Sequence, residues 1–500
     1  MKRLLSRRLL FVLSLLAAVF FSFVLFELQM LPLKYYVPIV VVIFILLLLL
    51  YVGERDKDNE HTIRTAFLKL IHILLSIVLV IASLYAMKGS DFLAAITGGS
   101  DQTIEMDVVV LKSSSYQSLE DLKGLSFGAN TAMDAVNINK TETLIEDEIG
   151  DIEIQAYTTH GDAIDALKNG TIQAMVIKAV DYETLDDVEA NFQDDTRVVE
   201  TFEIKIPSVK ANSAEVTQEP FMVFISGTDK EGPINTFALS DVNIIAAINP
   251  QTKQVLLLSI PRDYFVDIIG MDGVNGKDKL THSAKGGIEC TLKTVENLMG
   301  VEFNYYAKLN FTSFMNVIDA LGGITVDVPK YDVIGRDDGV FTTKLDKYTI
   351  APGINEFDSK HALSFVRERK AFVDGDAIRG KNQMLMIKAI IKKCCSSAIV
   401  TSLNDVFESL EDSFETNMEA SDIKALINMQ IDDMASWDVQ SYRLEGTSMR
   451  TFHLATVGDV SKVNPKGIYI TEPSGESLEK ANEYLQVIMN GNEILKVEDD

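Results

Sequence analysis

The 500-residue sequence predicts an α/β protein that is held in a membrane by three N-terminal helices. Two observations lead to this fold class. Apolar runs of about the twenty residues that a helix needs to cross a bilayer occupy 9–26, 35–52 and 66–87. After residue 88, strand-like segments take turns with segments of helical periodicity, a pattern typical of α/β domains. We therefore expect residues 1–88 to be a membrane anchor.

Positive charge predicts the orientation of this anchor. Lysine and arginine gather before the first run and before the third, whereas the loop after the first run has only Lys34. The two basic groups are Lys2, Arg3, Arg7 and Arg8, and then Arg55, Lys57, Arg64 and Lys69. Because basic loops stay in the cytoplasm, the N-terminus should be cytoplasmic and residues 88–500 extracytoplasmic. An even number of spans would invert this orientation.

The charge of the chain limits its partners. A formal net charge of −26 argues against nucleic acid, whose binding needs a basic face. The same charge would repel a polyanionic substrate unless arginines and a divalent cation reverse the field locally. The three cysteines, Cys290, Cys394 and Cys395, do not make a disulfide framework.

Two further domains follow the anchor. Residues 105–207 predict a small α/β accessory domain, with a strand at MDVVVLK and a helix at DYETLDDVEANF (181–192). Its phrases SLEDLKGLSFG and DAIDALKNGTIQA resemble one lobe of a bacterial solute-binding protein. The domain is too short for the usual two lobes, so a spacer or docking role competes with ligand binding. Residues 218–490 predict a larger α/β domain.

Arginines gather in the segment 358–393 of the larger domain. Arg367, Arg369 and Arg379 lie within thirteen residues of one another. The planar fork of donors on a guanidinium suits phosphate oxygens better than the point charge of a lysine. Alternation over 362–369 predicts a strand that presents Arg367 and Arg369 on one face.

The helix expected after this strand adds to the same group. Asp376, Arg379 and Gln383 fall at i, i+3 and i+7, on one stripe of that helix. A strand end and a helix start with convergent arginines are suited to clamping phosphate. The alternative is a solvated charged loop in which Asp376 only caps the helix.

Five phrases, in collinear order, resemble the LytR-CpsA-Psr family. They are GTD at 227–229, SDVNIIAAINPQTKQVLLLSIPRD at 240–263, KLTHSAKGG at 279–287, YYAKLNFTSFMNVIDALGGITVDVP at 305–329, and ALSFVRERK with DGDAIRGKNQ at 362–383. Three membrane spans and an intervening domain are similar to the capsule-associated branch. We therefore expect 218–490 to be a LytR-CpsA-Psr catalytic domain, an α/β/α sandwich around a mixed central sheet.

The resemblance implies a bacterial enzyme that transfers a glycopolymer, capsular or teichoic-acid-like, from polyprenyl pyrophosphate to peptidoglycan through a phosphodiester. Its partners would be the lipid-linked glycopolymer, peptidoglycan, the cytoplasmic membrane and polysaccharide-assembly proteins. Two other functions stay open. One is a polyprenyl-pyrophosphate phosphatase with water as acceptor. The other is a non-catalytic sensor or regulator of polysaccharide assembly, in which 105–207 binds a signal or a partner.

The resemblance also implies roles for individual residues. Asp241 and Asp263 would hold Mg²⁺ (or Mn²⁺), a hard ion that accepts carboxylates and phosphate oxygens. Asp376 would take the proton of the acceptor hydroxyl or position its attacking oxygen, while Lys279 and Gln383 would contact the substrate. The arginines that match the family's pyrophosphate site are Arg262, Arg367, Arg369 and Arg379. Arg262 and Arg379 would also support the catalytic step.

Four positions weaken or complicate the match. Leu239 and Lys230 stand where the family often has arginine, and Thr281 stands where it has asparagine. These departures would therefore affect how tightly the site binds the pyrophosphate headgroup of the lipid. His282, in the same family segment as Thr281, is better explained as a structural histidine than as a catalytic one.

Other matched positions have plainer explanations. Asp241 could cap a turn, and Arg262 with Asp263 could form an exposed ion pair of little energetic value. The apolar side chains of 311–323 belong either to the core or to a tunnel for the polyprenyl chain.

Overall fold

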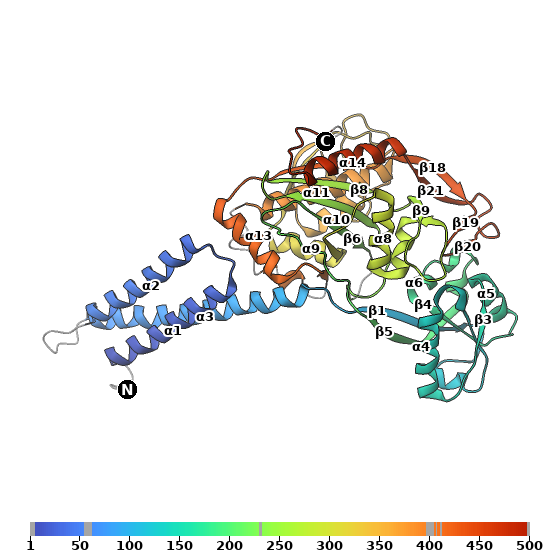
Figure 1. The fold of residues 1–500 in the computed structure, drawn as a ribbon, viewed down its shortest axis with the longest axis horizontal. Coiled ribbons are helices and arrows are strands. Elements are labelled where there is room, and N and C mark those ends of the chain that lie inside the picture. The colour runs from blue at the N-terminus through green and yellow to red at the C-terminus, as the bar shows by residue number, and fades with distance from the viewer. Residues whose placement is uncertain are drawn as a thin grey trace.

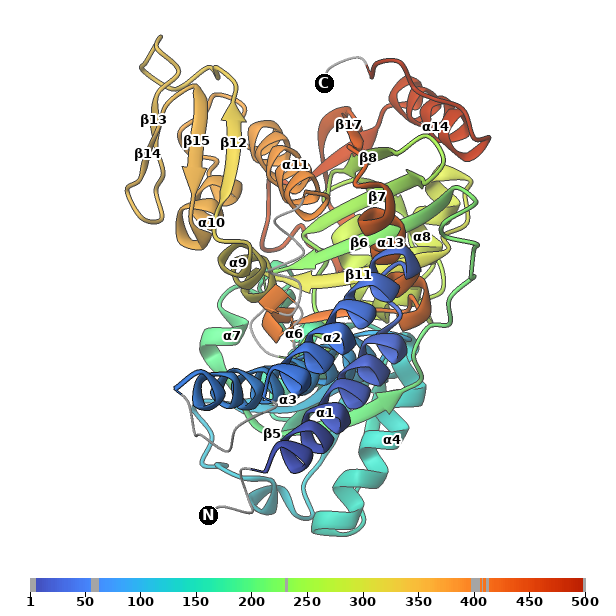
Figure 2. The same cartoon turned by 90° about the vertical axis from the view of Figure 1, so that its left-hand side faces the viewer.

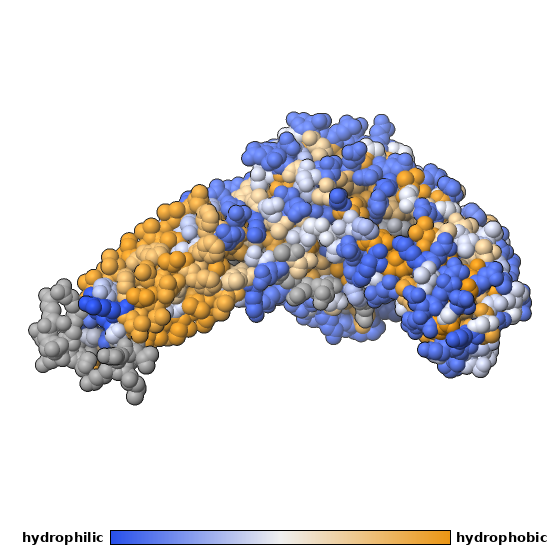
Figure 3. All heavy atoms as spheres, turned by 60° about the horizontal axis from the view of Figure 1, so that its bottom comes forward, coloured by the Kyte–Doolittle hydropathy of each residue, from blue (hydrophilic) through white to orange (hydrophobic). Residues whose placement is uncertain are grey.

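In the described part of the chain, three long apolar helices project from the rest of the protein in the computed structural model (Figure 1). They are α1 (Arg7–Leu28), α2 (Leu33–Gly53) and α3 (Ile63–Ile96). Each is long and apolar enough to cross a membrane, and their apolar surface is clear in Figure 3. The structure describes residues 6–54, 63–229, 233–396, 405–406, 408–410 and 413–497.

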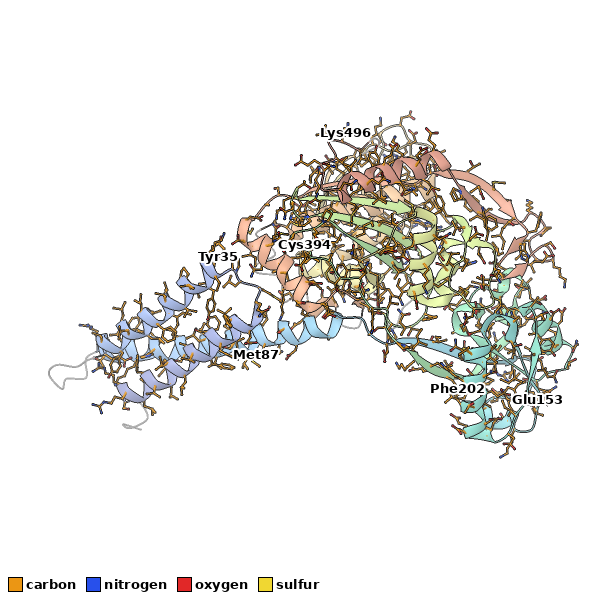
Figure 4. The ribbon with its side chains drawn as sticks, viewed as in Figure 1. Tyr35, Met87, Glu153, Phe202, Cys394 and Lys496 are labelled. Atoms are coloured by element: carbon orange, nitrogen blue, oxygen red, sulfur yellow. The ribbon has the colours of Figure 1, made fainter. Side chains whose placement is uncertain are left out.

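The end of this three-helix anchor that is nearest the larger domain packs against that domain. α3 continues past its expected end at residue 87, because Leu93 and Ile96 are buried against α13 (Ala420–Asp433). Tyr35, labelled in Figure 4, lies at the end of α2 nearest to α13. Beside it, Lys34 Nζ lies 2.8 Å from Asp432 Oδ1. The larger domain is therefore docked on the anchor rather than suspended from a long linker.

The accessory region contains, within the described residues, a five-stranded sheet of order β3-β2-β4-β1-β5. Its strands are β1 (Gln102–Leu111), β2 (Phe127–Asn130), β3 (Ile154–Tyr157), β4 (Ala174–Lys178) and β5 (Thr196–Ile206). Alternate residues of β1 face opposite sides. Val108 packs with α4 (Thr131–Ile149), and Val109 packs with α5 (His160–Lys168). A short 3-10 helix, η1, spans Leu119–Leu122.

The single helix predicted over 181–192 is wrong. The segment is divided among α6 (Ala179–Tyr182), the 3-10 helix η2 (Leu185–Asp187) and α7 (Phe192–Asp195). Asn191 has a left-handed backbone with φ of 59°, which ends any continuous helix there. Leu185 and Phe192 are buried beside α5, so packing of the two apolar side chains outweighs helical propensity.

The larger domain is built on a six-stranded mixed sheet, counted over the described residues, of order β16-β11-β6-β7-β8-β17. The strands are β6 (Phe221–Thr228), β7 (Val242–Asn249), β8 (Gln254–Ile260), β11 (Tyr305–Asn310), β16 (Phe414–Thr416) and β17 (Asp438–Arg443). β11 pairs with β6 and β17 with β8 in parallel, and the other neighbours are antiparallel.

Helices cover both faces of this sheet (Figure 2). On one face, Ile245 and Leu258 pack against α8 (Gly287–Met299) and α14 (Gly475–Met489). On the other face, Ala246 and Leu257 pack with Met384 of α11 (Gly375–Cys394). The predicted α/β/α sandwich with a mixed sheet is therefore confirmed.

The remaining elements lie around this sandwich. α9 (Phe311–Ala320) and α10 (Ser359–Arg367) share an apolar core with β12 and β15, and Ile318 of α9 is buried in this core. The short strands are β9 (Phe265–Asp267), β10 (Lys277–Lys279), β12 (Ile324–Val328), β13 (Phe341–Thr342), β14 (Thr349–Ile350), β15 (Gly353–Phe357), β18 (Gly446–Thr451), β19 (His453–Leu454), β20 (Gly458–Asp459) and β21 (Ile468–Pro473). A 3-10 helix, η3, spans Leu280–Gly286.

Buried charges join the accessory region to the larger domain. Lys285 Nζ lies 3.2 Å from Asp181 Oδ1 and donates a hydrogen bond of 2.7 Å to Thr184 Oγ1. Lys178 Nζ, which lies 3.1 Å from Asp134 Oδ2 within the accessory region, donates a hydrogen bond of 3.4 Å across the junction to the Lys285 carbonyl oxygen. Breaking a buried pair by removing one partner costs several kcal/mol, about 3–5. The two units are thus held in a fixed arrangement.

His160, beside this junction, predicts a loss of stability in mild acid. Burial lowers the pKa of His160 from 6.5 to about 4 despite the nearby Asp181 carboxylate, and Lys285 and Lys178 also disfavour the charged ring. Below pH 6.5 the His160 ring is protonated in the unfolded chain but stays neutral in the folded chain until the pH approaches 4. The free energy of unfolding should therefore fall by up to about 3 kcal/mol between pH 6.5 and 4.

Chemical denaturation of the detergent-solubilised chain at several pH values measures this loss. His160→Leu should flatten the pH dependence in this window, whereas the exposed His453→Asn should leave it unchanged. A wild-type chain whose stability is flat from pH 6.5 to 4 would contradict the prediction.

Candidate active site

Most of the predicted site residues surround one cavity of about 170 Å³, called here the arginine cavity. It lies where β6 and β8 end and where α11 begins, so the carboxyl edge of the sheet meets a helix start. Its polar lining comes from Asp229, Asp241, Arg262, Arg367, Arg369, Arg379 and Gln383, with Phe311 beside them. The four arginines drawn from three separate segments therefore converge as a phosphate clamp requires.

Arg367 and Arg369 reach the cavity from a helix end and a loop, so the strand predicted over 362–369 is wrong. The helix α10 starts where the Asp358 side chain accepts a hydrogen bond of 2.8 Å from the His361 N–H. Ala362, Phe365 and Val366 are buried at i, i+3 and i+4, the spacing of a helix face. That apolar face outweighs the alternation that suggested a strand.

Close backbone packing holds the loop of Arg369 against the start of α11. A Cβ on Gly375 would lie 2.2 Å from the Arg369 carbonyl oxygen, so only glycine permits this approach. Arg367 is the last residue of α10, and its guanidinium carbon lies 4.7 Å from the centre of the Phe311 ring. Cation–π contact of this kind fixes the orientation of a guanidinium.

The start of α11 is capped by Asp374, not by Asp376. The Asp374 side chain accepts a hydrogen bond of 3.2 Å from the Ala377 N–H. Arg379 and Gln383 lie one turn apart on α11 and line the same cavity, as the predicted helix stripe requires. Asp376 lies in the first turn of α11, and its side chain falls outside what the structure describes.

Arg262 connects the carboxylates of the site. Arg262 Nη1 donates a hydrogen bond to Asp241 Oδ1, and Arg262 Nε lies 3.6 Å from Asp263 Oδ2. Lys279 Nζ lies 2.9 Å from Asp263 Oδ1, so Asp263 sits between two cations. The Asp263 side chain is only 16% exposed, which makes this a partly enclosed network rather than a surface pair.

Asp241 also has an acidic neighbour. Burial raises the pKa of Asp241, Asp229 raises it further, and Arg262 opposes both. Two adjacent carboxylates repel each other unless a proton or a cation lies between them. Asp229 and Asp241 together therefore have the donor set that a divalent cation prefers.

A metal ion at this site would be held by two carboxylates, and oxygens of a bound substrate would complete its coordination. Over the residues described, no group of three His, Cys, Asp or Glu side chains converges on one point. Mg²⁺ commonly binds one or two carboxylates together with phosphate oxygens and water. Asp229 and Asp241 suit that pattern better than the predicted pair of Asp241 and Asp263, because Asp263 is already paired with Arg262 and Lys279.

His282 is buried, and its hydrogen bond to Asp278 makes it part of a structural network. Its Nδ1 lies 2.7 Å from Asp278 Oδ1, and Asp278 Oδ2 accepts hydrogen bonds from the Thr456 N–H and hydroxyl. Burial opposes ionisation, but His282 and Thr456 outweigh it and lower the pKa of Asp278 to about 2. This network ties η3 to the loop after β19.

Sequence reasoning missed three residues at the site. Asp229 stands in the GTD phrase and Phe311 in the phrase FTSFMN, so both were within recognised segments but had no assigned role. Arg443, at the end of β17, lines an adjoining cavity of about 50 Å³ with Arg262 and Arg379. Nothing in the sequence pointed to Arg443. Lys230 lies outside the described residues.

Comparison with known proteins identifies relatives of the larger domain. The chain is 34% identical over 274 residues to the polyisoprenyl-teichoic acid–peptidoglycan teichoic acid transferase TagU of Bacillus licheniformis, covering 54% of this chain and 79% of that protein. It is 30% identical over 273 residues to TagT of Bacillus subtilis, covering 54% and 77%. A solved structure described as "TagT bound to LIIa-WTA" matches with 27% identity, 56% and 97% coverage and a TM-score of 0.44.

Two family models match the chain. One, described as DNA polymerase processivity factor, matches residues 64–177, which comprise most of α3 and part of the smaller sheet. The other, described as the LytR_cpsA_psr family, matches residues 178–485 and so covers the arginine cavity and all six strands of the larger sheet, as far as these are described. Since this second match spans more than half of the sequence, the chain belongs to the LytR-CpsA-Psr family.

Proposed function

We propose that the protein is a membrane-anchored phosphotransferase that moves a glycopolymer from polyprenyl pyrophosphate to peptidoglycan. The observation that carries this function is the convergence of four arginines and a carboxylate pair on one cavity. TagU of Bacillus licheniformis, to which the chain is 34% identical, has a name that describes transfer of teichoic acid to peptidoglycan. The polymer here is capsular or teichoic-acid-like, and the product is a phosphodiester.

The reaction divides into one bond made and one bond broken. The acceptor hydroxyl oxygen attacks the phosphorus that carries the polymer, and the bond from that phosphorus to the bridging oxygen breaks. Polyprenyl phosphate leaves with the bridging oxygen, and the hydroxyl proton passes to a base. Little covalent chemistry falls to the protein, so catalysis consists mainly of positioning and charge neutralisation.

The residues at the cavity suit these two tasks. Arg262, Arg367, Arg369 and Arg379 bind the pyrophosphate oxygens, and Gln383 donates a hydrogen bond to the headgroup. Asp229 and Asp241 would hold Mg²⁺ (or Mn²⁺), which supplies Lewis-acid stabilisation of charge on the phosphate oxygens. Asp376, in the first turn of α11, would accept the proton of the acceptor hydroxyl. Asp263 and Lys279 fix the orientation of Arg262.

Product analysis with purified full-length protein tests this function. A polyprenyl-pyrophosphate-linked disaccharide, labelled in the sugar, is incubated with insoluble peptidoglycan in detergent. We expect label in the peptidoglycan pellet, an equal amount of polyprenyl phosphate, and release of the label by phosphodiester cleavage. Soluble sugar phosphate without labelled pellet would identify a phosphatase instead. An intact lipid donor would contradict both enzymatic functions and favour a regulator of polysaccharide assembly.

The proposed function requires the larger domain to lie outside the cytoplasmic membrane. Reporters fused after Lys88 or after Asp500 should therefore read as extracytoplasmic, because basic residues such as Arg7 and Arg64 favour cytoplasmic ends for α1 and α3. A reporter between residues 53 and 65 should read as cytoplasmic. A cytoplasmic reading at residue 500 would exclude peptidoglycan as the acceptor.

Titration with Mg²⁺ tests the carboxylate pair. Asp241→Asn should raise the Mg²⁺ concentration for half-maximal activity by roughly tenfold or more, because a carboxylate is lost from a hard-ion site. Asp263→Asn is the matched control, and its Mg²⁺ titration should keep the wild-type midpoint while its maximal rate falls. Identical titration curves for Asp241→Asn and wild type, with a shifted curve for Asp263→Asn, would assign the metal to Asp263.

A further inference from the structure

A cavity of about 200 Å³ lies between the accessory region and the larger domain, and is called here the interdomain cavity. The accessory region contributes Glu183, Asp186 and Asp187 from the segment that replaced the predicted helix. The larger domain contributes Arg262, Lys279 and Thr281. One wall is therefore acidic, and the facing wall carries two cations, Arg262 and Lys279, beside one carboxylate, Asp263.

The interdomain cavity adjoins the site of phosphate chemistry. Arg262 lines both this cavity and the arginine cavity, so one guanidinium belongs to both walls. Lys279 and Asp263, which orient Arg262, also line the interdomain cavity. In a displacement at phosphorus, the attacking and leaving oxygens lie roughly in line on opposite sides. Two cavities that meet at a phosphate-binding arginine provide separate places for the two substrates.

The acidic wall is held firmly rather than carried on a loose loop. Thr184, directly between the acidic residues, accepts a 2.7 Å hydrogen bond from Lys285 Nζ, and both residues are buried. Asn464 Nδ2 of the larger domain lies 3.5 Å from the carbonyl oxygen of Asp187 and donates to it. A wall fixed by buried contacts on both sides of the junction is preorganised for a ligand.

Thr281 adds a polar group that has no hydrogen-bond partner among the described residues. It is 5% exposed, and its hydroxyl forms no hydrogen bond to any residue that the structure describes. The Thr281 N–H donates a hydrogen bond of 2.9 Å to the Arg262 carbonyl, which places this hydroxyl beside the shared arginine. A buried hydroxyl without a partner is costly, so it points to a ligand group that completes the bond.

The charges of the cavity select the class of ligand. Glu183 and Asp186 are exposed, Asp187 is half-buried, and all three carboxylates accept hydrogen bonds but cannot donate them. Such a wall repels a polyanionic polymer and suits the hydroxyl and acetamido groups of an uncharged sugar. Sugars occur in both substrates, but a glycopolymer attached through phosphates is the more anionic of the two.

We propose that the interdomain cavity binds a sugar of the acceptor glycan and presents its hydroxyl to the phosphorus held at Arg262. This inference rests on the proposed phosphotransferase function and gives the accessory region a direct part in it. Glu183, Asp186 and Asp187 accept hydrogen bonds from sugar hydroxyls, and Thr281 bonds the remaining polar group of the ring.

The test combines binding with kinetics on full-length protein. The variants are the double substitution Asp186→Asn with Asp187→Asn, and separately Thr281→Val. Asp147→Asn, on the exposed face of α4 and away from the cavity lining, is the matched control. The probe is a peptidoglycan glycan fragment whose stem peptides are removed and whose lactyl carboxyl groups are capped as amides, so that it is uncharged; its affinity is measured directly on protein loaded with polyprenyl pyrophosphate and its KM in the transfer reaction.

We expect the double variant to weaken glycan binding and raise the glycan KM by about tenfold or more, with donor affinity within about twofold of wild type. Thr281→Val should have a smaller effect in the same direction, and Asp147→Asn none. Weakened donor binding with unchanged glycan binding would overturn the inference and assign the cavity to the donor sugar. Stronger donor binding alone, from relief of repulsion, or no change at all, would also overturn it.

Direct binding keeps this test separate from the proposed function. If the wild-type chain transfers nothing but binds the glycan, and the double variant loses that binding, then the cavity is a glycan site and the phosphotransferase proposal fails. If transfer proceeds normally in every variant and glycan binding is unaffected, the function stands and the inference fails.

Discussion

Replacing Arg262 with alanine is expected to lower kcat/KM for transfer by about 10³-fold, the size of effect seen when an arginine that neutralises a phosphoryl-transfer transition state is removed. Arg262 has several contacts at stake. It bonds Asp241, lies beside Asp263, and lines the arginine cavity and the interdomain cavity. Its removal also takes away the guanidinium charge that offsets the repulsion between the Asp229 and Asp241 carboxylates.

Two further variants make this result interpretable. Arg262→Lys keeps one charge but loses the planar fork, so we expect activity between that of alanine and wild type. Arg336→Ala removes an exposed arginine that is paired only with Asp338 in the described residues, and it should leave transfer unchanged. Normal donor binding and turnover in Arg262→Ala would reduce Arg262 to the ion pair with Asp263 that was considered as its alternative.

Asp376→Asn is expected to lower turnover by about 10²–10⁴-fold at saturating Mg²⁺, with donor affinity kept, because a general base contributes about that much. Asp374→Asn is the matched control two residues earlier. Asparagine caps helices as well as aspartate, so the Asp374 variant should keep α11 and most of the activity. The measurement is single-turnover transfer with donor binding followed in parallel. Unchanged turnover in Asp376→Asn would exclude the base role.

Local sequence pattern was reliable where one periodicity dominated. The strand-like segments after residue 88 predicted an α/β domain, and the apolar runs around Ile245 and Leu258 are buried strands of it, as the structure shows. The stripe of Arg379 and Gln383 predicted a helix, which the structure also shows. The pattern failed at 362–369, where alternation and helix spacing are both present. The helix formed there because Asp358 caps it and its apolar face meets the core shared with α9.

Long-range contacts could not be predicted from the sequence. Arg443 reaches the site only because β17 pairs with β8, which Arg262 follows. The junction likewise depends on Lys285 meeting Asp181, two residues more than a hundred positions apart. No local signal distinguishes these charges from the many others on an acidic chain. Asp229 was recognisable as part of a phrase, but its role depends on its nearness to Asp241.

The contacts between α13 and the helical anchor determine how far from the bilayer the enzyme can work. Leu93 and Ile96 are buried against α13, and Lys34 is paired with Asp432, so the catalytic domain cannot swing outward on a tether. The working height of the phosphate site above the lipid headgroups is therefore constant. Glycan strands beyond that height are out of reach, whatever their chemistry. If peptidoglycan is the acceptor, as proposed, the polymer would therefore be attached to strands within that height of the membrane.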